Sequence, residues 1–221
     1  YPVIFIFHAP PPKGNSLTHS DATLYFIHDP MCSWCWGFRP IWQQLETQLK
    51  NTLDIVYLVG GLAPDSDQPM PMAMQQNLAA TWQRIQQQIP GTDFNYEFWN
   101  LASNTQPRRS TYPACRAVLA AKIQDPDLEK AMILGIQQAY YLNAKNTSNV
   151  DILATVADNI GLNKQQFTHD MASQTLELEL KQQFKLARQL SSQGFPSLVL
   201  SKGGKLYAIP LDYNDSQTMQ Q

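Results

Sequence analysis

Two cysteines spaced three positions apart, Cys32 and Cys35, are the residues of this chain best suited to carry chemistry. On a helix their side chains would lie one turn apart, so one thiol can reach the other. Such a pair exchanges disulfides with another molecule by way of a mixed-disulfide intermediate. A Cys-x-x-Cys pair beside a strand–helix–strand pattern is typical of a redox site.

The residues around the pair predict a strand that leads into a helix. The apolar run Leu24–Ile27 has the length and the aromatic and branched residues of a buried strand, and the dipeptide Asp29-Pro30 ends it as a turn. Beyond the cysteines, apolar residues recur at positions 41, 45 and 49, which is helical spacing. The two cysteines are therefore expected in the first turn of this helix.

That position favours the reactive thiolate. The first N–H groups of a helix have no partner within the helix, and the helix dipole favours negative charge there. Cysteines in such settings have pKa values lowered from about 8.5 to roughly 3.5–7.5. We therefore predict that Cys32 is the nucleophile and that Cys35 is the resolving thiol.

A metal site is the main alternative for the pair. The chain has three cysteines, the third being Cys115, and its four histidines show no His-x(3–5)-His spacing. A Cys-x-x-Cys pair alone supplies half of a zinc or iron–sulfur site. We therefore predict neither a metal nor another cofactor.

Length and charge limit the class of protein. The chain has 221 residues, which fits one large domain or a domain with a sizeable insertion. Its 16 basic and 18 acidic residues nearly cancel, so neither nucleic acid nor an anionic membrane is expected as a partner. No apolar run reaches 18 residues, and no transmembrane helix is predicted.

The compartment is predicted from the first residues and from Cys115. The apolar segment Tyr1–Phe7 lacks a basic leader and a clear cleavage site, and it is followed by three prolines, so it makes a poor signal peptide. The chain does not begin with Met, and a removed leader would permit a periplasmic protein. Because an unpaired Cys115 fits a reducing compartment better, we predict a cytoplasmic protein.

Hydrophobic patterns predict an α/β protein interrupted by helices. Thr111 is expected to cap the helix that follows it, with Pro113 just inside, and the tail 211–221 is expected to be frayed at most. The expected strands cover residues 22–27, 53–59, 197–201 and 205–209, and the expected helices cover residues 32–49, 74–89, 111–122, 127–142, 150–160, 164–171 and 176–190, with 93–109 irregular.

The same patterns divide the chain into four parts. The first two strands flank a helix, which predicts a parallel pair with a right-handed crossover, and the last two flank Gly203-Gly204, which predicts an antiparallel hairpin. The predicted parts are an extension at 1–21, the first half of an α/β domain at 22–64, an inserted helical subdomain at 65–174 and the second half at 175–221.

Three segments in this order resemble the DsbA-like branch of the thioredoxin superfamily, and two of them its FrnE-type members in particular. They are DPMCSWCWGF at Asp29–Phe38, PACRA at Pro113–Ala117 and GFPS at Gly194–Ser197. The first two are the ones that resemble the FrnE type. The resemblance covers roughly residues 22–209. It implies a bacterial protein with a thioredoxin-like α/β fold and a large inserted helical subdomain.

The resemblance also implies a substrate site. Phe195-Pro196 would be a cis peptide packed against the cysteines, whereas the residues alone permit either isomer. The backbone of Phe195 would then pair with an extended substrate strand, and Trp34 would add apolar surface, so Trp34, Phe195 and Pro196 are predicted to bind substrate. Trp36 and Phe38 either extend that surface or belong to the core, with core favoured for Phe38.

The chain departs from the family at one position. Related proteins often carry a buried acid six residues before the first cysteine, where this chain has Phe26. The nearest ionisable side chains are His28 and Asp29, and His28 is interpreted as a strand-end histidine bonded by backbone, with a catalytic base as the alternative. Cys115 is interpreted as a buried structural residue, with a third redox thiol as the alternative.

The predicted function is a thiol–disulfide oxidoreductase of the oxidase or isomerase type. Its partners would be thiol- or disulfide-containing proteins, with glutathione left open, and the protein would be a monomer or a homodimer. One alternative is a glutathione-dependent isomerase or kappa-type transferase, although those relatives generally carry serine at the position of Cys32. Another is a peptide-binding chaperone whose thiols are incidental. The direction of electron flow is not determined by the sequence.

Overall fold

The structure is a computed structural model that describes residues 22–100, 107–191 and 194–220. The predicted extension at 1–21 lies outside these ranges. In chain order the elements are β1 (Ala22–His28), α1 (Ser33–Leu49), β2 (Asp54–Val59), α2 (Met72–Gln88), the 3-10 helix η1 (Tyr96–Trp99), α3 (Tyr112–Gln124), the 3-10 helix η2 (Pro126–Leu128), α4 (Glu129–Tyr141), α5 (Val150–Asn159), α6 (Lys164–Met171), α7 (Gln174–Leu190), β3 (Ser197–Lys202), β4 (Lys205–Ile209) and the 3-10 helix η3 (Thr218–Gln220).

The sheet has the strand order β2-β1-β3-β4. Strand β1 runs parallel to β2 and antiparallel to β3, and β3 and β4 are antiparallel, so the predicted parallel pair and hairpin are confirmed. At one edge of the sheet His28 is opposite Val59, and Ile27 is opposite Ser197. The end of β1, the end of β2 and the start of β3 therefore meet where the chain enters the cysteine pair.

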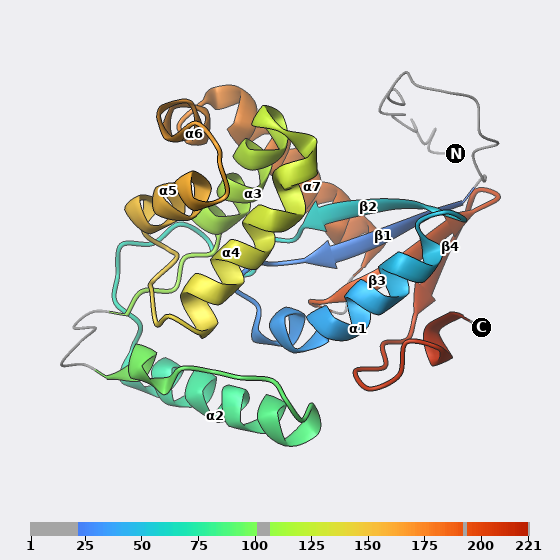
Figure 1. Ribbon diagram of the computed structural model, residues 1–221, viewed down its shortest axis with the longest axis horizontal. Coiled ribbons are helices and arrows are strands. Elements are labelled where there is room, and N and C mark those ends of the chain that lie inside the picture. Colours follow the sequence, from blue (N-terminus) through green and yellow to red (C-terminus); the bar gives the residue numbers. More distant parts are fainter. Residues whose placement is uncertain (1–21, 101–106, 192–193, 221) are drawn as a thin grey trace, which may run out of the picture.

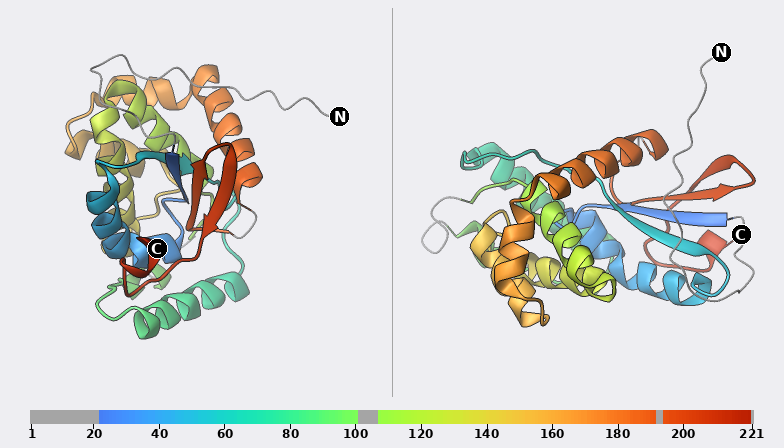
Figure 2. Two further views of the ribbon diagram at one scale, coloured as in Figure 1. Left: turned by 90° about the vertical axis from the view of Figure 1, so that its right-hand side faces the viewer. Right: turned by 90° about the horizontal axis from the view of Figure 1, so that it is seen from above.

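Helices cover both faces of the sheet (Figure 2). Helix α1 covers one face, where Leu24 and Phe26 of β1 belong to the main core, and α7 covers the other, where Ile27 packs with Ala187 and Val199. The alternation along β1 follows from the two-residue period of a strand. This strand is thus buried on both sides and fixes the position of the residues that follow it.

The remaining helices lie outside these two layers (Figure 1). Helices α3 to α6 lie beyond the carboxyl ends of β1 and β2, and α2 lies alongside the beginning of α1. In sequence they all fall between β2 and α7. The α/β fold with inserted helices is confirmed, while the boundaries at residues 64/65 and 174/175 stay predictions. Within the described ranges, no helix has the length and apolar character needed to cross a membrane.

Three local expectations are wrong. The 3-10 helix η1 falls inside the segment expected to be irregular, and it buries Phe98 completely. Thr111 precedes α3 as expected, but its side chain makes no capping hydrogen bond, since its hydroxyl is used elsewhere. The C-terminal segment is packed, because Tyr213 contacts the ring of Phe38 and Met219 is buried.

Candidate active site

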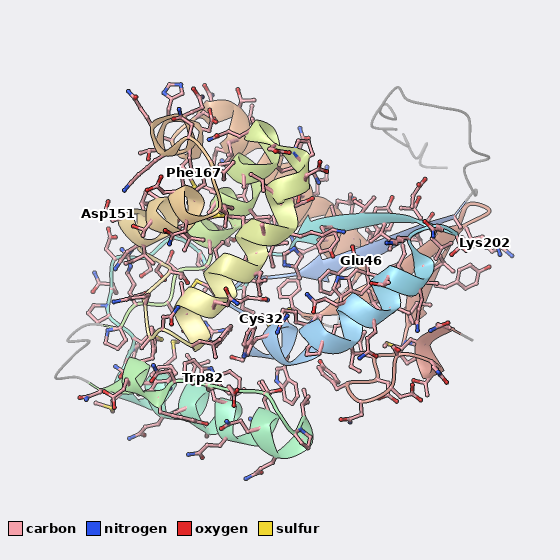
Figure 3. All side chains as sticks on the ribbon, in the orientation of Figure 1. Cys32, Glu46, Trp82, Asp151, Phe167 and Lys202 are labelled. Atoms are coloured by element: carbon pink, nitrogen blue, oxygen red, sulfur yellow. The ribbon has the colours of Figure 1, made fainter. Side chains whose placement is uncertain are left out.

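Cys32 is the N-cap residue of α1, in extended backbone conformation (Figure 3). Its N–H donates to the carbonyl of Asp29 at 3.0 Å, which closes the turn between β1 and α1. Both residues of the pair are buried, since Cys32 is 6% exposed and Cys35 is 2% exposed. All three cysteines are free thiols.

The two thiols of the pair differ in acidity. The pKa of Cys32 is lowered, first by the hydrogen bond from the Cys35 thiol and then by the N–H groups of Cys35 and Trp34 at the start of α1, against the opposing effects of burial and of Asp29. The pKa of Cys35 is raised well above its usual value by burial and by the sulfur of Cys32. Cys32 is therefore the thiol that ionises first, as its predicted role requires.

The Phe195–Pro196 peptide is cis and faces the cysteines. The Cys32 thiol donates to the carbonyl oxygen of Phe195 at 3.4 Å. Beside this contact lies an open cavity of about 600 Å³ whose lining includes Trp34, Phe195 and Pro196. The structure thus brings together all three residues predicted to bind substrate, and it adds Tyr213, whose ring meets that of Trp34 edge-on at 5.4 Å.

Gly60, the residue after β2, provides the space that Phe195 occupies. A Cβ added to Gly60 would lie 2.0 Å from the Phe195 ring. The N–H of Gly60 donates to the carbonyl of His28 at 2.7 Å, which prevents the backbone from moving away. The position of the Phe195 backbone therefore depends on the absence of a side chain here.

Gly60→Ala is expected to displace Phe195 from Cys32. Because no real Cβ contact is as short as 2.0 Å, the ring must shift, and the Phe195 carbonyl moves with it. Overpacking of this kind costs about 1–3 kcal/mol in the free energy of unfolding. We expect a slower reaction of Cys32 with peptide disulfides and an unchanged reaction with a small alkylating agent. Gly135→Ala on α4, whose Cβ would lie 2.6 Å from Val156, is the control, because it overpacks the core at another place. Unchanged peptide kinetics in Gly60→Ala would contradict this role.

Asp29 is a buried carboxylate that ties the cysteine turn to the inserted helices. It accepts hydrogen bonds from the N–H of Met31 at 2.8 Å, the N–H of Leu62 at 2.7 Å and the hydroxyl of Thr111 at 2.6 Å. The thiol of Cys115 also points at it, with 3.7 Å between sulfur and oxygen. Burial raises the pKa of Asp29, and these hydrogen bonds oppose that effect.

Asp29→Asn is expected to lower the free energy of unfolding by about 1–3 kcal/mol. One carboxylate oxygen is replaced by an NH₂ group, which cannot accept the hydrogen bonds that buried groups now donate to that oxygen. The charge of Asp29 raises the pKa of both Cys32 and Cys35, so the same variant should lower the pKa of Cys32. Urea unfolding measures the first effect, and the ultraviolet absorbance of the thiolate measures the second. Asp158→Asn, on the exposed side of α5, is the control. An unchanged Cys32 pKa would show that the Asp29 charge does not act on this thiol.

His28 differs from its predicted setting. It is 1% exposed, and neither ring nitrogen has a hydrogen-bond partner among the described residues, so the expected bond to backbone is absent there. Its ring stacks on Phe26 with the centroids 5.2 Å apart. Burial, aided by Lys122, lowers the pKa of His28 from 6.5 to about 3, so the ring is neutral at neutral pH.

Other residues singled out in the sequence lie in the core. Cys115 is completely buried and its pKa is raised, first by burial, which favours the structural interpretation. Phe38 is also completely buried, and Trp36 is 6% exposed with its indole N–H donating to the carbonyl of Asp93 at 3.0 Å. In the part of the chain that is described, no three His, Cys, Asp or Glu side chains are grouped to hold a metal ion.

The sequence reasoning missed three residues of this region. Tyr213 carries no local signal, because its contacts come from a segment that lies far from the cysteines in the chain. Trp82 donates from its indole N–H to the hydroxyl of Ser33 at 3.0 Å, which fixes α2 against the cysteine pair. The role of Gly60 could have been predicted from the sequence, since paired glycines directly after a strand indicate a close approach of another chain segment.

Comparisons with solved structures agree with this geometry. A Nitrosomonas europaea protein, provisionally described as a protein disulfide isomerase, is 26% identical with a TM-score of 0.78, over 90% of this chain and 94% of that one. The cytosolic disulfide reductase DsbM from Pseudomonas aeruginosa is 26% identical with a TM-score of 0.71, over 85% of this chain and 89% of that one.

Among curated proteins, the chain is similar to the ClpXP adapter protein SpxH. The identity is 23% over 180 residues for the protein of Halalkalibacterium halodurans, which covers 80% of this chain and 57% of the relative. The chain thus spans little more than half the length of this relative.

The family model described as Thioredoxin matches residues 25–208, which include the cysteine pair, the cis-proline and the inserted helices. The two solved structures above are described as a protein disulfide isomerase and a disulfide reductase, and the chain itself belongs to the thioredoxin family.

Proposed function

We propose that this protein is a thiol–disulfide oxidoreductase of the oxidase or isomerase type, with Cys32 as the nucleophile and Cys35 as the resolving thiol. The observation that supports it is the pair of unequal thiols at the start of α1, with the Cys32 sulfur 3.4 Å from the carbonyl oxygen of a cis X-Pro peptide. Serine at the first position would suit a glutathione transferase, and this chain has cysteine there.

The exchange proceeds in two displacements. The Cys32 thiolate attacks one sulfur of a substrate disulfide, forms a mixed disulfide and releases the other substrate sulfur as a thiolate. The sulfur of Cys35, once deprotonated, then attacks the sulfur of Cys32, which closes the Cys32–Cys35 disulfide and releases the second substrate thiolate. The substrate is reduced by two electrons and the protein is oxidised by two, and the reverse sequence oxidises a dithiol substrate.

The substrate would be a protein segment bound in extended conformation. The backbone of Phe195 leads into β3, and the cavity of about 600 Å³ offers apolar contacts to flanking side chains from Trp34 and Pro196. Pairing of this kind recognises backbone and is tolerant of sequence. Glutathione is a smaller candidate for the same cavity, since DsbM is also known in a structure with GSH. The buried free thiol of Cys115 and the cytosolic DsbM support a cytoplasmic location, where a pair of high reduction potential stays reduced and can act as an isomerase.

The reduction potential of the Cys32–Cys35 pair tests the proposal. Stabilisation of the Cys32 thiolate favours the reduced form and so raises the potential, and we expect a value of about −120 to −180 mV, as for an oxidant or isomerase. The protein is equilibrated in glutathione buffers and the disulfide is detected by mass spectrometry. A value near about −270 mV would make it a reductant and overturn the proposed type. No disulfide at any potential would overturn the redox function altogether.

A further inference from the structure

Cys35 lines a second, smaller cavity that is separate from the one beside Phe195. This cavity has a volume of about 70 Å³, and none of its lining residues lines the larger cavity. It lies between the sheet, α1 and α4, and α1 lines it from Cys35 to Glu46, which are both on one face of the helix. Figure 3 shows Glu46 further along α1 than Cys32. The resolving thiol therefore has an outlet that does not pass through the substrate side.

The buried end of this cavity carries polar atoms without partners. Three such atoms are the two ring nitrogens of His28 and the side-chain oxygen of Gln137. They have no hydrogen-bond partner among the described residues, although His28 is 1% exposed and Gln137 is 3% exposed. Buried polar groups are seldom left unpaired, and small polar cavities that offer two to four partners are where proteins hold internal water. A volume of about 70 Å³ is enough for one or more water molecules.

We propose that this cavity is a proton-relay site in which water connects the Cys35 thiol with the ring of His28 and the amide of Gln137. The inference rests on the proposed function, because it concerns the second displacement. When the Cys35 sulfur attacks the Cys32 sulfur, its proton passes to the cavity water and from there to solvent. The substrate thiolate leaves with the bonding electron pair, and no oxidant beyond the mixed disulfide is needed.

His28 can pass a proton on, but it does not remain protonated. Because its pKa is about 3, the ring stays neutral, with one nitrogen able to accept a hydrogen bond and the other able to donate one. A group of that pKa cannot hold the proton of a thiol whose pKa is raised well above its usual value. It can take up a proton on one side while it releases one on the other.

Charged groups surround the outlet. Gln43 and Lys130 are exposed and mark where the cavity meets the surface. The titratable or charged groups that line the cavity or act on its buried end come from several elements. They are Cys35, Arg39 and Glu46 of α1, Cys32 and Asp29 of the cysteine turn, His28 of β1, Tyr57 of β2, Lys122 of α3 and Lys130 of α4. Glu46 already accepts hydrogen bonds from the Tyr57 hydroxyl and from Lys130. The proton thus has solvated carriers at the mouth of the cavity.

A two-phase exchange assay on the full chain tests the relay. Reduced protein is mixed with dithio-bis-nitrobenzoate in a stopped-flow instrument, where the first nitrothiobenzoate released reports the attack by Cys32 and the second reports the resolution by Cys35. We expect His28→Phe, which keeps the ring stack and removes the nitrogens, to slow the second phase roughly 100-fold near neutral pH. The first phase should not change. The deficit should shrink as the pH approaches the pKa of Cys35, because the thiol then ionises without help.

Two further variants separate the relay from other roles of His28. His28→Gln keeps a donor and an acceptor in the cavity, so its second phase should stay within a few-fold of the unaltered protein, whereas Gln137→Leu should slow that phase. His169→Phe, an exposed histidine on α6, is the matched control. Equal second phases in His28→Phe, Gln137→Leu and the unaltered protein would overturn the relay, as would loss in His28→Gln with retention in His28→Phe. Absence of both phases in the unaltered protein would instead refute the proposed function.

Discussion

Cys32→Ser is expected to abolish thiol–disulfide exchange, with a loss on the order of a thousandfold or more, since a serine hydroxyl is neither ionised nor nucleophilic at neutral pH. Cys35→Ser has a different expected outcome. The first displacement still occurs, because the serine hydroxyl can donate to Cys32 in place of the Cys35 thiol and the N–H groups of α1 remain, but nothing then resolves the mixed disulfide. Mass spectrometry of each variant after mixing with a disulfide peptide should show no adduct for Cys32→Ser and a stable adduct for Cys35→Ser.

Cys115→Ser is the matched control for this pair. Cys115 is completely buried and contacts Asp29, so the substitution can lower the free energy of unfolding. The Cys115→Ser variant should nevertheless retain both displacements. Equal residual turnover in Cys32→Ser and Cys35→Ser would reject the assignment of nucleophile and resolving thiol. Loss of turnover in Cys115→Ser with an intact fold would point to a third redox thiol.

The protein is expected to lose stability in acid through His28. The pKa of His28 is about 3 in the folded protein and 6.5 as the unperturbed value, so the unfolded chain binds the proton first as the pH falls. The stabilisation is full above about pH 6.5 and is lost between about pH 6.5 and pH 3. For this fully buried ring the loss amounts to about 2 kcal/mol at about pH 5 and approaches 5 kcal/mol once the folded pKa is reached.

Urea unfolding at a series of pH values measures this effect. His28→Phe removes the titrating ring, so its free energy of unfolding should depend less steeply on pH, and the two curves should diverge below about pH 6.5. In His169→Phe the exposed ring is replaced, and the curve should follow that of the unaltered protein. Parallel curves for the unaltered protein and His28→Phe would show that His28 is not held neutral in the folded state.

Local patterns were sufficient for most of the elements. The strand before the cysteines, the helix after them and the hairpin around Gly203-Gly204 follow from periodicity and turn residues, and each lies within a residue or two of its expected bounds. The segment that became η1 was missed, because its aromatic residues show no period along the chain. Phe98 and Trp82 instead pack across it with their ring centroids 6.0 Å apart.

The chemical character of Cys32 and Cys35 was predictable for a related reason. Their spacing and their place between a strand and a helix are local facts. The groups that lower the pKa of Cys32 are the Cys35 thiol and the N–H groups of Cys35 and Trp34, all within three residues of it. The cis state of Phe195–Pro196 was different, because it entered as an implication of the family and the residues themselves permit either isomer.

The sequence by itself determined the position of the cysteine pair, the strand–helix–strand unit around it and the class of fold, because each is encoded in residues that are neighbours in the chain. Only the tertiary structure decided which distant groups meet that pair. Gly60 faces Phe195, Thr111 binds Asp29, and His28 and Gln137 share a cavity with Cys35. These contacts join segments far apart in sequence, and they depend on how α3, α4 and the strands pack, which no local period specifies.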